Sequence, residues 1–267
     1  MGDGDLGLLD GRADKPVSYR NGQVDDGVSP RMRKRRSPGD MTTDERASPA
    51  EIITPELVAS LLADGDDDLA AWALGEALAA RPRAVVFDEL VQPALRLVGA
   101  NWESGRWTVA EEHLASRALD NALARIRPAT IPETRVGPVA VLAAPRGEQH
   151  AAGLVCLAQV LEEDGWKVEN LGPNLPHGDL VRFVAGRTVD LVALSISRTA
   201  ALPALRTTIN AIRRAGLSED DLPIMVGGRG TTDLEDSVTG AQVVGPSVVE
   251  AQRFAREVAR RVSRAME

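Results

Sequence analysis

The stretch Val139-Ala-Val-Leu-Ala-Ala-Pro-Arg-Gly147-Glu148-Gln149-His150-Ala151-Ala152-Gly153 decides how this chain folds. Its first six residues are apolar and predict a buried parallel strand, and the apolar residues from Leu154 onward predict a helix. His150 therefore lies at a strand-to-helix turn. In an open α/β sheet such turns lie at the carboxyl ends of the strands, where ligands bind.

The residues around His150 suit a metal ligand. Gly147 and Gly153 let a bulky group approach the backbone, and the Glu148 carboxylate can accept the second ring proton of His150 and so fix its tautomer. We interpret His150 as a candidate ligand for a metal or a metal-bearing cofactor. The alternative is that this histidine is only solvated or hydrogen-bonded in its turn, which is the commoner situation.

The rest of residues 135–267 alternates between strand and helix patterns. Strands are expected at Val139–Ala144, Trp166–Leu171, Leu191–Ser197, Pro223–Val226 and Ala241–Val244. Helices are expected at 151–163, 177–187, 200–214 and 231–237, and a long terminal helix begins near Val248. This alternation requires right-handed crossovers, so we predict an α/β domain with a doubly wound, parallel, five-stranded, Rossmann-like (flavodoxin-like) sheet.

Residues 51–128 have a helical pattern instead. Helices are expected from Thr54-Pro55 to Gly65, from Leu69 to Ala80, from Ala84 to Asn101 with a kink at Pro93, and from Thr108 to Ile126. The last begins with a capping box formed by Thr108 and Glu111. Short connections between helices predict a small four-helix bundle that precedes the sheet domain.

Residues 1–50 have few large apolar side chains, and we expect a disordered tail. Its basic run, Arg31 to Arg36, could contact nucleic acid, but flanking acidic residues favour a linker. The net charge of −8 argues for weak or no direct nucleic-acid binding. No membrane span or signal peptide is indicated, and the single Cys156, which we expect to be a buried hydrophobe, suits the reducing cytoplasm.

Three features of the predicted sheet meet at one edge. His150 follows the first strand, Ser195 and Ser197 end the third, and Gly227-Gly228 ends the fourth. Small residues and a hydroxyl would admit and hydrogen-bond an inserted ligand tail. Each feature alone is ordinary for a strand end, but their combination is unusual.

The spacing of these residues resembles the Asp-x-His-x-x-Gly, Ser-x-Leu and Gly-Gly signature of cobalamin-binding domains. The chain has Glu148-x-His150-x-x-Gly153, then 41 residues before Ser195, and the glycine pair after Val226. The resemblance implies a corrinoid bound base-off, with His150 as the lower cobalt ligand and the nucleotide tail beside Ser195, Gly227 and Gly228. Glu148 replaces the commoner aspartate, and Ser197 stands where the signature has leucine.

The fourth helix of the bundle carries a second constellation. Val109, Glu112, His113 and Ser116 share one helix face. A carboxylate and a histidine on one face can be ordinary solvated surface. A large ring close to that face, Trp102 at the end of the preceding helix, favours the lid of a binding site.

The segment Trp102-x9-Glu112-His113 is similar to the bundle caps of CarH/LitR-type light-sensing regulators. The resemblance implies that Trp102 packs over the upper corrin face, against an adenosyl group that Glu112 contacts, and that Val109 fits the same pattern. It also implies that His113 becomes an upper cobalt ligand after light has cleaved the cobalt–carbon bond. Adenosylcobalamin is the expected cofactor form, with methylcobalamin and hydroxocobalamin as alternatives.

These resemblances favour a sensor over an enzyme. We expect a light-responsive cobalamin-binding protein that controls transcription through a partner protein such as a transcription regulator, because we find no MerR-type DNA-binding pattern before the bundle. The protein could also form homo-oligomers.

The alternative is a corrinoid carrier protein for a cobalamin-dependent methyltransferase, and storage or delivery of cobalamin is a third, weaker possibility. A carrier gains nothing from an upper histidine, so Glu112-His113 separates the first two hypotheses. We find no catalytic set of residues.

Overall fold

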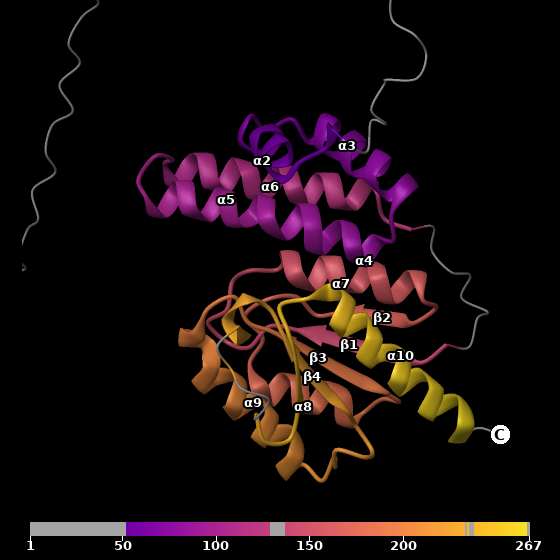
Figure 1. Ribbon diagram of the computed structural model, residues 1–267. Helices are drawn as coiled ribbons and strands as arrows, with labels where there is room; N and C mark the ends of the chain where they lie inside the picture. Colours follow the sequence, from indigo (N-terminus) through magenta and orange to yellow (C-terminus); the bar gives the residue numbers. More distant parts are fainter. Residues whose placement is uncertain (1–51, 129–136, 233, 235–237, 266–267) are drawn as a thin grey trace, which may run out of the picture. The chain divides into compact units, whose positions relative to one another are not determined.

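A parallel five-stranded sheet lies at the centre of the C-terminal part of the structure (Figure 1). The computed structural model describes residues 52–128, 137–232, 234 and 238–265. The strands are β1 (Val139–Ala143), β2 (Lys167–Asn170), β3 (Leu191–Ser195), β4 (Ile224–Gly227) and β5 (Gln242–Gly245). Their order is β2-β1-β3-β4-β5, which confirms the predicted doubly wound topology. In this order the chain reverses direction across the sheet between β1 and β3, where ligands bind in such folds.

Helices cover both faces of the sheet. One face packs against α7 (Ala152–Glu163) and α10 (Val248–Ala265), and the other packs against α8 (His177–Ala185) and α9 (Leu202–Arg214). Both faces of the central strands are buried because successive side chains of β1 and β3 point to opposite faces and are apolar on each. Of the helix expected at 231–237, residues 233 and 235–237 lie outside the described residues, and Thr231 is the last residue of a short 3-10 turn, Arg229–Thr231.

The helical part begins with α2 (Pro55–Ala63) and α3 (Asp67–Ala80). It continues through α4 (Arg83–Val86), a π-helical segment (Phe87–Val91), α5 (Gln92–Glu103) and α6 (Val109–Arg125). The Thr54 hydroxyl accepts a hydrogen bond from the Leu57 N–H at the start of α2. The predicted capping box of Thr108 and Glu111 is present at the start of α6.

The helix expected at 84–101 contains an irregularity just before Pro93. Proline has no N–H to donate to the carbonyl four residues earlier, so the backbone of the preceding turn is free to adopt another hydrogen-bond pattern. Here that turn is the π-helical segment, Phe87–Val91. Such segments are rare, and they are frequent at functional sites.

The bundle packs on α7, which lies between the bundle and the sheet (Figure 1). One hydrophobic core includes residues of both parts, since Cys156 and Val160 of α7 are buried among bundle side chains. The buried Arg83 guanidinium donates to the Gln159 side chain over 3.0 Å and to the Ile126 carbonyl over 2.9 Å. The Gln159 amide donates in turn to the carbonyl of Leu123, so the attachment is polar as well as apolar.

No helix within the described ranges combines the length and the apolar character that a membrane span requires. The expectations for residues 1–50, including the tail and the run from Arg31 to Arg36, concern residues outside those ranges.

Candidate functional site

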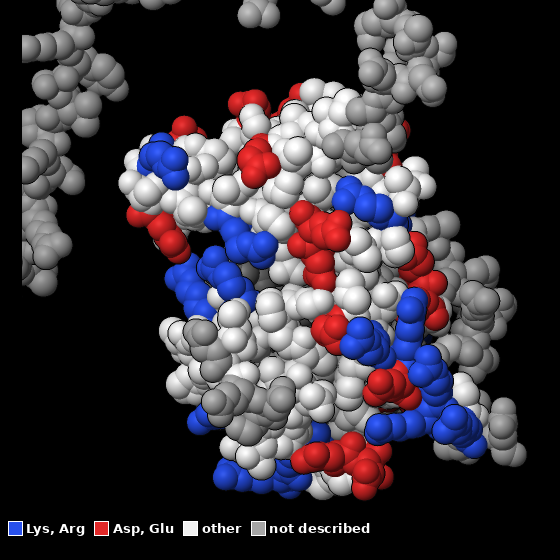
Figure 2. All heavy atoms as spheres, viewed as in Figure 1, with Lys and Arg blue, Asp and Glu red and all other residues white. Residues whose placement is uncertain are grey.

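A cavity of about 610 Å³ lies between the bundle and the carboxyl ends of the strands. Its walls come from α5 and α6, from the turn after β1, and from the ends of β3, β4 and β5. The predicted site residues that line it are Trp102, Val109, Glu112, His113, His150, Gly153, Ser195, Ser197, Gly227 and Gly228. Residues far apart in the sequence therefore meet at one site. Figure 2 shows the molecule hollowed beside the bundle, with blue Lys and Arg side chains at the edge of the hollow.

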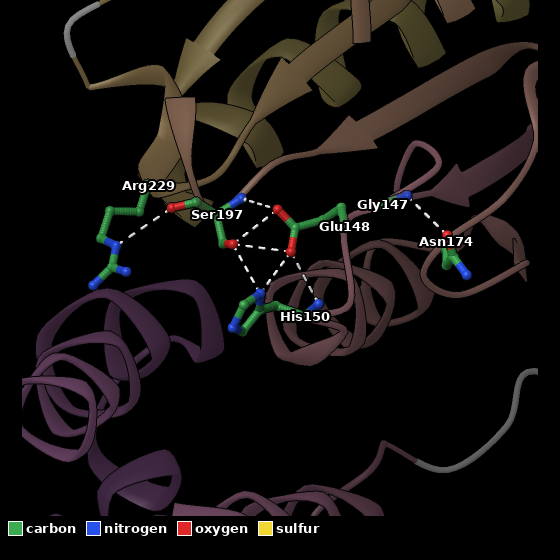
Figure 3. A network of polar contacts seen from close by, with 6 residues as sticks. All are labelled: Gly147, Glu148, His150, Asn174, Ser197 and Arg229. Carbon is green, nitrogen blue, oxygen red and sulfur yellow. Dashed lines mark hydrogen bonds and ion pairs between the residues drawn. The ribbon is translucent and has the colours of Figure 1, made fainter. Parts of the chain in front are cut away.

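Glu148, the remaining predicted residue, lies behind His150 and is 4% exposed. Its Oε1 atom lies 2.6 Å from His150 Nδ1 and also accepts the His150 N–H over 3.0 Å. The Ser197 N–H donates to Glu148 Oε2 over 2.7 Å, and the Ser197 hydroxyl lies 2.8 Å from the same atom. The carboxylate thus ties the turn after β1 to the segment after β3 (Figure 3).

The hydrogen bonds to Glu148 keep it ionised. Burial by itself would raise the pKa of this carboxyl, but the hydrogen bonds from His150 and Ser197 outweigh burial and lower the pKa to about 2. An ionised carboxylate can only accept hydrogen bonds, so His150 must carry its proton on Nδ1. In the neutral imidazole the lone pair is then on Nε2, which has no hydrogen-bond partner among the described residues and lies on the side of the ring away from Glu148 (Figure 3).

Ser197 contributes differently from what the motif suggests. We expected it beside an inserted tail, at the position where the signature has leucine. Its hydroxyl instead contacts Glu148, and it lies 2.9 Å from His150 Nδ1. Ser197 therefore belongs to the hydrogen-bond network that orients the imidazole, and Arg229 donates to its carbonyl over 3.4 Å.

Small residues form a slot at the ends of β3 and β4. A Cβ atom on Gly228 would lie 2.3 Å from the Ile196 carbonyl oxygen, and the residue has φ +95°, so only glycine fits there. A Cβ atom on Gly153 would lie 3.4 Å from Ser195 Oγ, and one on Gly227 would lie 3.1 Å from the Gly245 carbonyl oxygen. A Cβ atom on Gly228 would also lie 3.0 Å from Ser195 Oγ, so Gly153 and Gly228 both border this hydroxyl, and larger side chains there would crowd it.

The bundle wall of the cavity carries the second predicted constellation. The Ser116 hydroxyl donates to Glu112 Oε1 over 2.8 Å, and His113 Nε2 lies 3.6 Å from Glu112 Oε2. The apolar residues Trp102 and Val109 also line the cavity, and they are 37% and 55% exposed. Exposed apolar surface inside a cavity indicates a place that a ligand covers.

Some residues of the cavity were not predicted. Arg96, Arg198 and Arg229 line it, and so does Gly245, which has φ +68°. The Gly245-Pro246 pair after the fifth expected strand is a turn signal that could have indicated this loop. The arginines carry no comparable signal, since isolated arginines in the sequence do not reveal where they meet.

The donor atoms at the site suit a metal that brings most of its own ligands. Among the described residues no three His, Cys, Asp or Glu side chains come together to hold a bare metal ion. One oriented imidazole, that of His150, faces a large cavity, which suits a metal held in a macrocycle. The slot lined by glycines beside it suits a tail attached to that macrocycle. The fold and the site together define a corrinoid-binding class of protein.

Comparison with known proteins agrees with this class. Residues 138–256 match a family model described as B12 binding domain, and residues 56–127 match a second model with the same description. The chain therefore contains two segments that match B12 binding domains, one in the sheet domain and one in the bundle. Cobalamin is the cofactor that these matches support.

Two groups of curated proteins are similar to this chain. The chain is 37% identical over 156 residues to the HTH-type transcriptional repressor CarH of Myxococcus xanthus, covering 58% of this chain and 50% of the repressor. It is 26% identical over 164 residues to dimethylamine corrinoid protein 3 of Methanosarcina mazei, covering 60% of this chain and 97% of that protein. The chain thus spans about half the length of the curated repressor it matches.

A solved structure supports the fold. The monomethylamine corrinoid protein of Methanosarcina barkeri superposes with a TM-score of 0.62 at 20% identity, covering 76% of this chain and 96% of the other. At this identity the likeness concerns the arrangement of helices and strands.

Proposed function

We propose that this protein is a cobalamin-binding sensor in which the bundle, residues 51–128, responds to the state of a cofactor held by the sheet domain, residues 135–267. The observation that carries the proposal is that His150, from the turn after β1, and the Glu112-His113 pair, from α6, line one cavity. A cofactor that fills this cavity is contacted from both parts of the chain, so a change in its upper ligand alters the contacts of the bundle.

Each group of residues has a stated role in the proposal. His150 Nε2 is the lower cobalt ligand, with Glu148 and Ser197 holding the ring in place. The slot residues Gly153, Ser195, Gly227 and Gly228 accept the nucleotide tail.

On the bundle side, Trp102, Val109 and Glu112 would contact an adenosyl group, and His113 would be available as a cobalt ligand once that group has left. Bound adenosylcobalamin supplies a cobalt–carbon bond that light can break.

The proposed output is control of transcription in the cytoplasm through a partner protein. The similarity to a transcriptional repressor, 37% identity over 156 residues, supports this proposal. The net charge of −8 favours a protein partner over direct binding to nucleic acid. Homo-oligomers are a further possible form of the signal, and both outputs are compatible with a non-enzymatic role.

The alternative function is that of a corrinoid carrier for a methyltransferase. It is supported by the similarity to dimethylamine corrinoid protein 3, which this chain covers over 97% of its length. A carrier must leave its upper face open to a second protein. The Glu112-His113 pair separates the two functions: it lines the cavity beside Trp102, and the His113 side chain is 72% exposed.

The deciding experiment is an absorption spectrum of the chain loaded with adenosylcobalamin in the dark and then exposed to green light. The sensor hypothesis expects an irreversible spectral change and a different elution volume in size-exclusion chromatography. An identical spectrum before and after light would reject light sensing and leave the carrier as the better account.

Histidine variants test the two axial ligands separately. We expect His150→Ala to lose most of its cobalamin affinity, and His113→Ala to bind normally in the dark but to lose the illuminated spectrum of two axial imidazoles. His177→Ala, at the start of α8 and away from the cavity, is the matched control and should behave as wild type. Unchanged binding by His150→Ala would contradict the lower-ligand assignment.

A further inference from the structure

Asp88 of the π-helical segment accepts hydrogen bonds from the sheet domain as well as from its own helix. Its Oδ2 accepts from the Ser247 hydroxyl over 2.7 Å, and its Oδ1 accepts from the Val248 N–H over 2.8 Å. The Val249 N–H also lies 3.2 Å from Oδ2. Val248 and Val249 begin α10, so a carboxylate from the bundle caps a helix of the sheet domain.

The neighbouring Gln92 reinforces this attachment. Its amide nitrogen donates to Asp88 Oδ1 over 2.6 Å and to the Pro246 carbonyl over 2.9 Å. Gln92 is the first residue of α5, which carries Trp102 at its other end. The position of α5 is thus fixed against the segment Gly245–Ser247.

The same segment borders the slot for the cofactor tail. Gly245, Pro246 and Ser247 line the cavity, and the Gly245 carbonyl accepts the Gly228 N–H over 3.2 Å. The segment Gly245–Ser247 is therefore hydrogen-bonded at one end to Gly228 of the sheet domain and at the other end to Asp88 of the bundle.

We infer that Asp88 is a positioning residue of the cofactor site, which couples occupation of the tail slot to the placement of α5 over the cavity. This inference rests on the proposed function and extends it, because it names the contact by which the bundle responds. Asp88 does not line the cavity, so it acts through Gln92 and Ser247, which do.

A second attachment joins the bundle to the sheet domain, and we expect it to hold the bundle in place when Asp88 is altered. Arg83 and Gln159 are buried, bond to one another, and lie outside the cavity lining. They hold the bundle on α7 independently of the cofactor. The Asp88 contacts, in contrast, are only half-buried and adjoin the cavity.

The test uses the full chain, hydroxocobalamin as the ligand, and hydrogen exchange as the readout. In wild type we expect hydroxocobalamin to protect amides of the His150 turn and also amides of α5 and α6. In Asp88→Ala we expect the protection of the His150 turn and the spectrum of the bound cofactor to persist. Protection of α5 and α6 should fall by roughly two- to thirtyfold, the range found for residues that couple two sites.

Further variants make the test decisive. Asp88→Asn keeps one acceptor oxygen and should restore part of the protection. Ser247→Ala removes the hydroxyl contact to Asp88 but keeps the N–H groups of Val248 and Val249 that also donate to Asp88. This variant replaces Asp88→Ala in the test if Asp88→Ala does not fold. The control is Glu89→Gln, since the neighbouring Glu89 is exposed and pairs with Arg81 instead.

The outcomes separate this inference from the proposed function. If the wild-type chain does not bind hydroxocobalamin, the proposed function is rejected, and the inference is rejected as well because it rests on that function. If wild type binds and both Asp88→Ala and Ser247→Ala protect α5 and α6 as wild type does, the inference alone is overturned. Loss of α5 and α6 protection with an unchanged cofactor spectrum supports it, because general unfolding would also change the spectrum.

Discussion

The Nδ1 atom of His150 lies 2.6 Å from Oε1 of Glu148, and the same carboxylate accepts the Ser197 N–H from the segment after β3. One buried anion thus orients the imidazole and joins two strand ends. Glu148 therefore affects both cofactor binding and the stability of the cofactor-free chain, and these two effects can be measured separately.

Replacing Glu148 with glutamine should weaken cobalamin binding by roughly 10- to 100-fold, the usual cost of losing a partner behind a metal ligand. The amide has no negative charge to raise the basicity of His150. Affinity is measured by spectral titration with hydroxocobalamin. Glu148→Asp keeps the carboxylate and should retain more affinity than Glu148→Gln, while the exposed Glu257→Gln should bind as wild type. Equal affinities for all four proteins would contradict this assignment.

Glu148 also predicts a pH dependence of stability for the cofactor-free chain. Its pKa is lowered to about 2 in the folded state from an unfolded value of 4.5, so its stabilising contribution is fully present above about pH 4.5. That contribution is lost as the pH falls from 4.5 toward 2. The check is the difference in free energy of unfolding between wild type and Glu148→Gln, from urea titrations at several pH values. The difference should be constant near neutral pH and shrink in acid, whereas a difference that grows in acid would contradict the prediction.

Gly153→Ala should separate binding from stability. The new Cβ would meet Ser195 Oγ at 3.4 Å, an ordinary contact, so the fold tolerates it, and alanine favours the first turn of α7. The methyl group narrows the slot, and we expect cobalamin affinity to fall on the order of tenfold or more while the melting temperature stays equal or rises.

The matched control for that substitution is Gly75→Ala in α3, where a Cβ would have no neighbour within 4 Å. It should raise stability by about 1 kcal/mol and leave cobalamin binding unchanged. If Gly153→Ala binds cobalamin as tightly as Gly75→Ala does, the slot does not accept the tail.

Cys156 should be unreactive in the folded chain. Burial raises the pKa of its thiol to about 12, and the nearby charge of Asp88 acts in the same direction while Arg83 opposes it. At pH 8 the reaction with a disulfide reagent should be slower on the order of a thousandfold than in concentrated guanidinium chloride. Comparable rates in the two conditions would show that α7 and the bundle open readily at this position.

The sheet and the lower half of the site could be predicted because local patterns define them. Apolar runs identified β1 and β3, and the turn after β1 contains Glu148 and His150 within three residues. The residues at which the strands end were predicted less accurately. The third strand was expected to reach Ser197 but ends at Ser195, since the next residues turn to bring the Ser197 N–H to Glu148.

Contacts between residues far apart in the sequence could not be predicted, because no local sequence pattern indicates them. The Asp88 contacts join residues about 160 positions apart, and the π-helical segment that presents Asp88 has no sequence signature of its own beyond the following Pro93. The role of His113 as an upper ligand stays a prediction, because it depends on a cofactor state and not on the fold.

The buried contact between Arg83 and Gln159 bears on how this pair of domains can be recombined. Moving the sheet domain onto a different helical module would leave the Gln159 amide without its acceptor, the Leu123 carbonyl. Moving the bundle onto a different sheet domain would take the Arg83 guanidinium away from Gln159 and Glu163. Each such orphaned group costs about 1–3 kcal/mol, and more when it is charged. An exchange of one domain for another therefore disturbs these buried contacts, whereas an exchange of what lies outside the two domains leaves them intact.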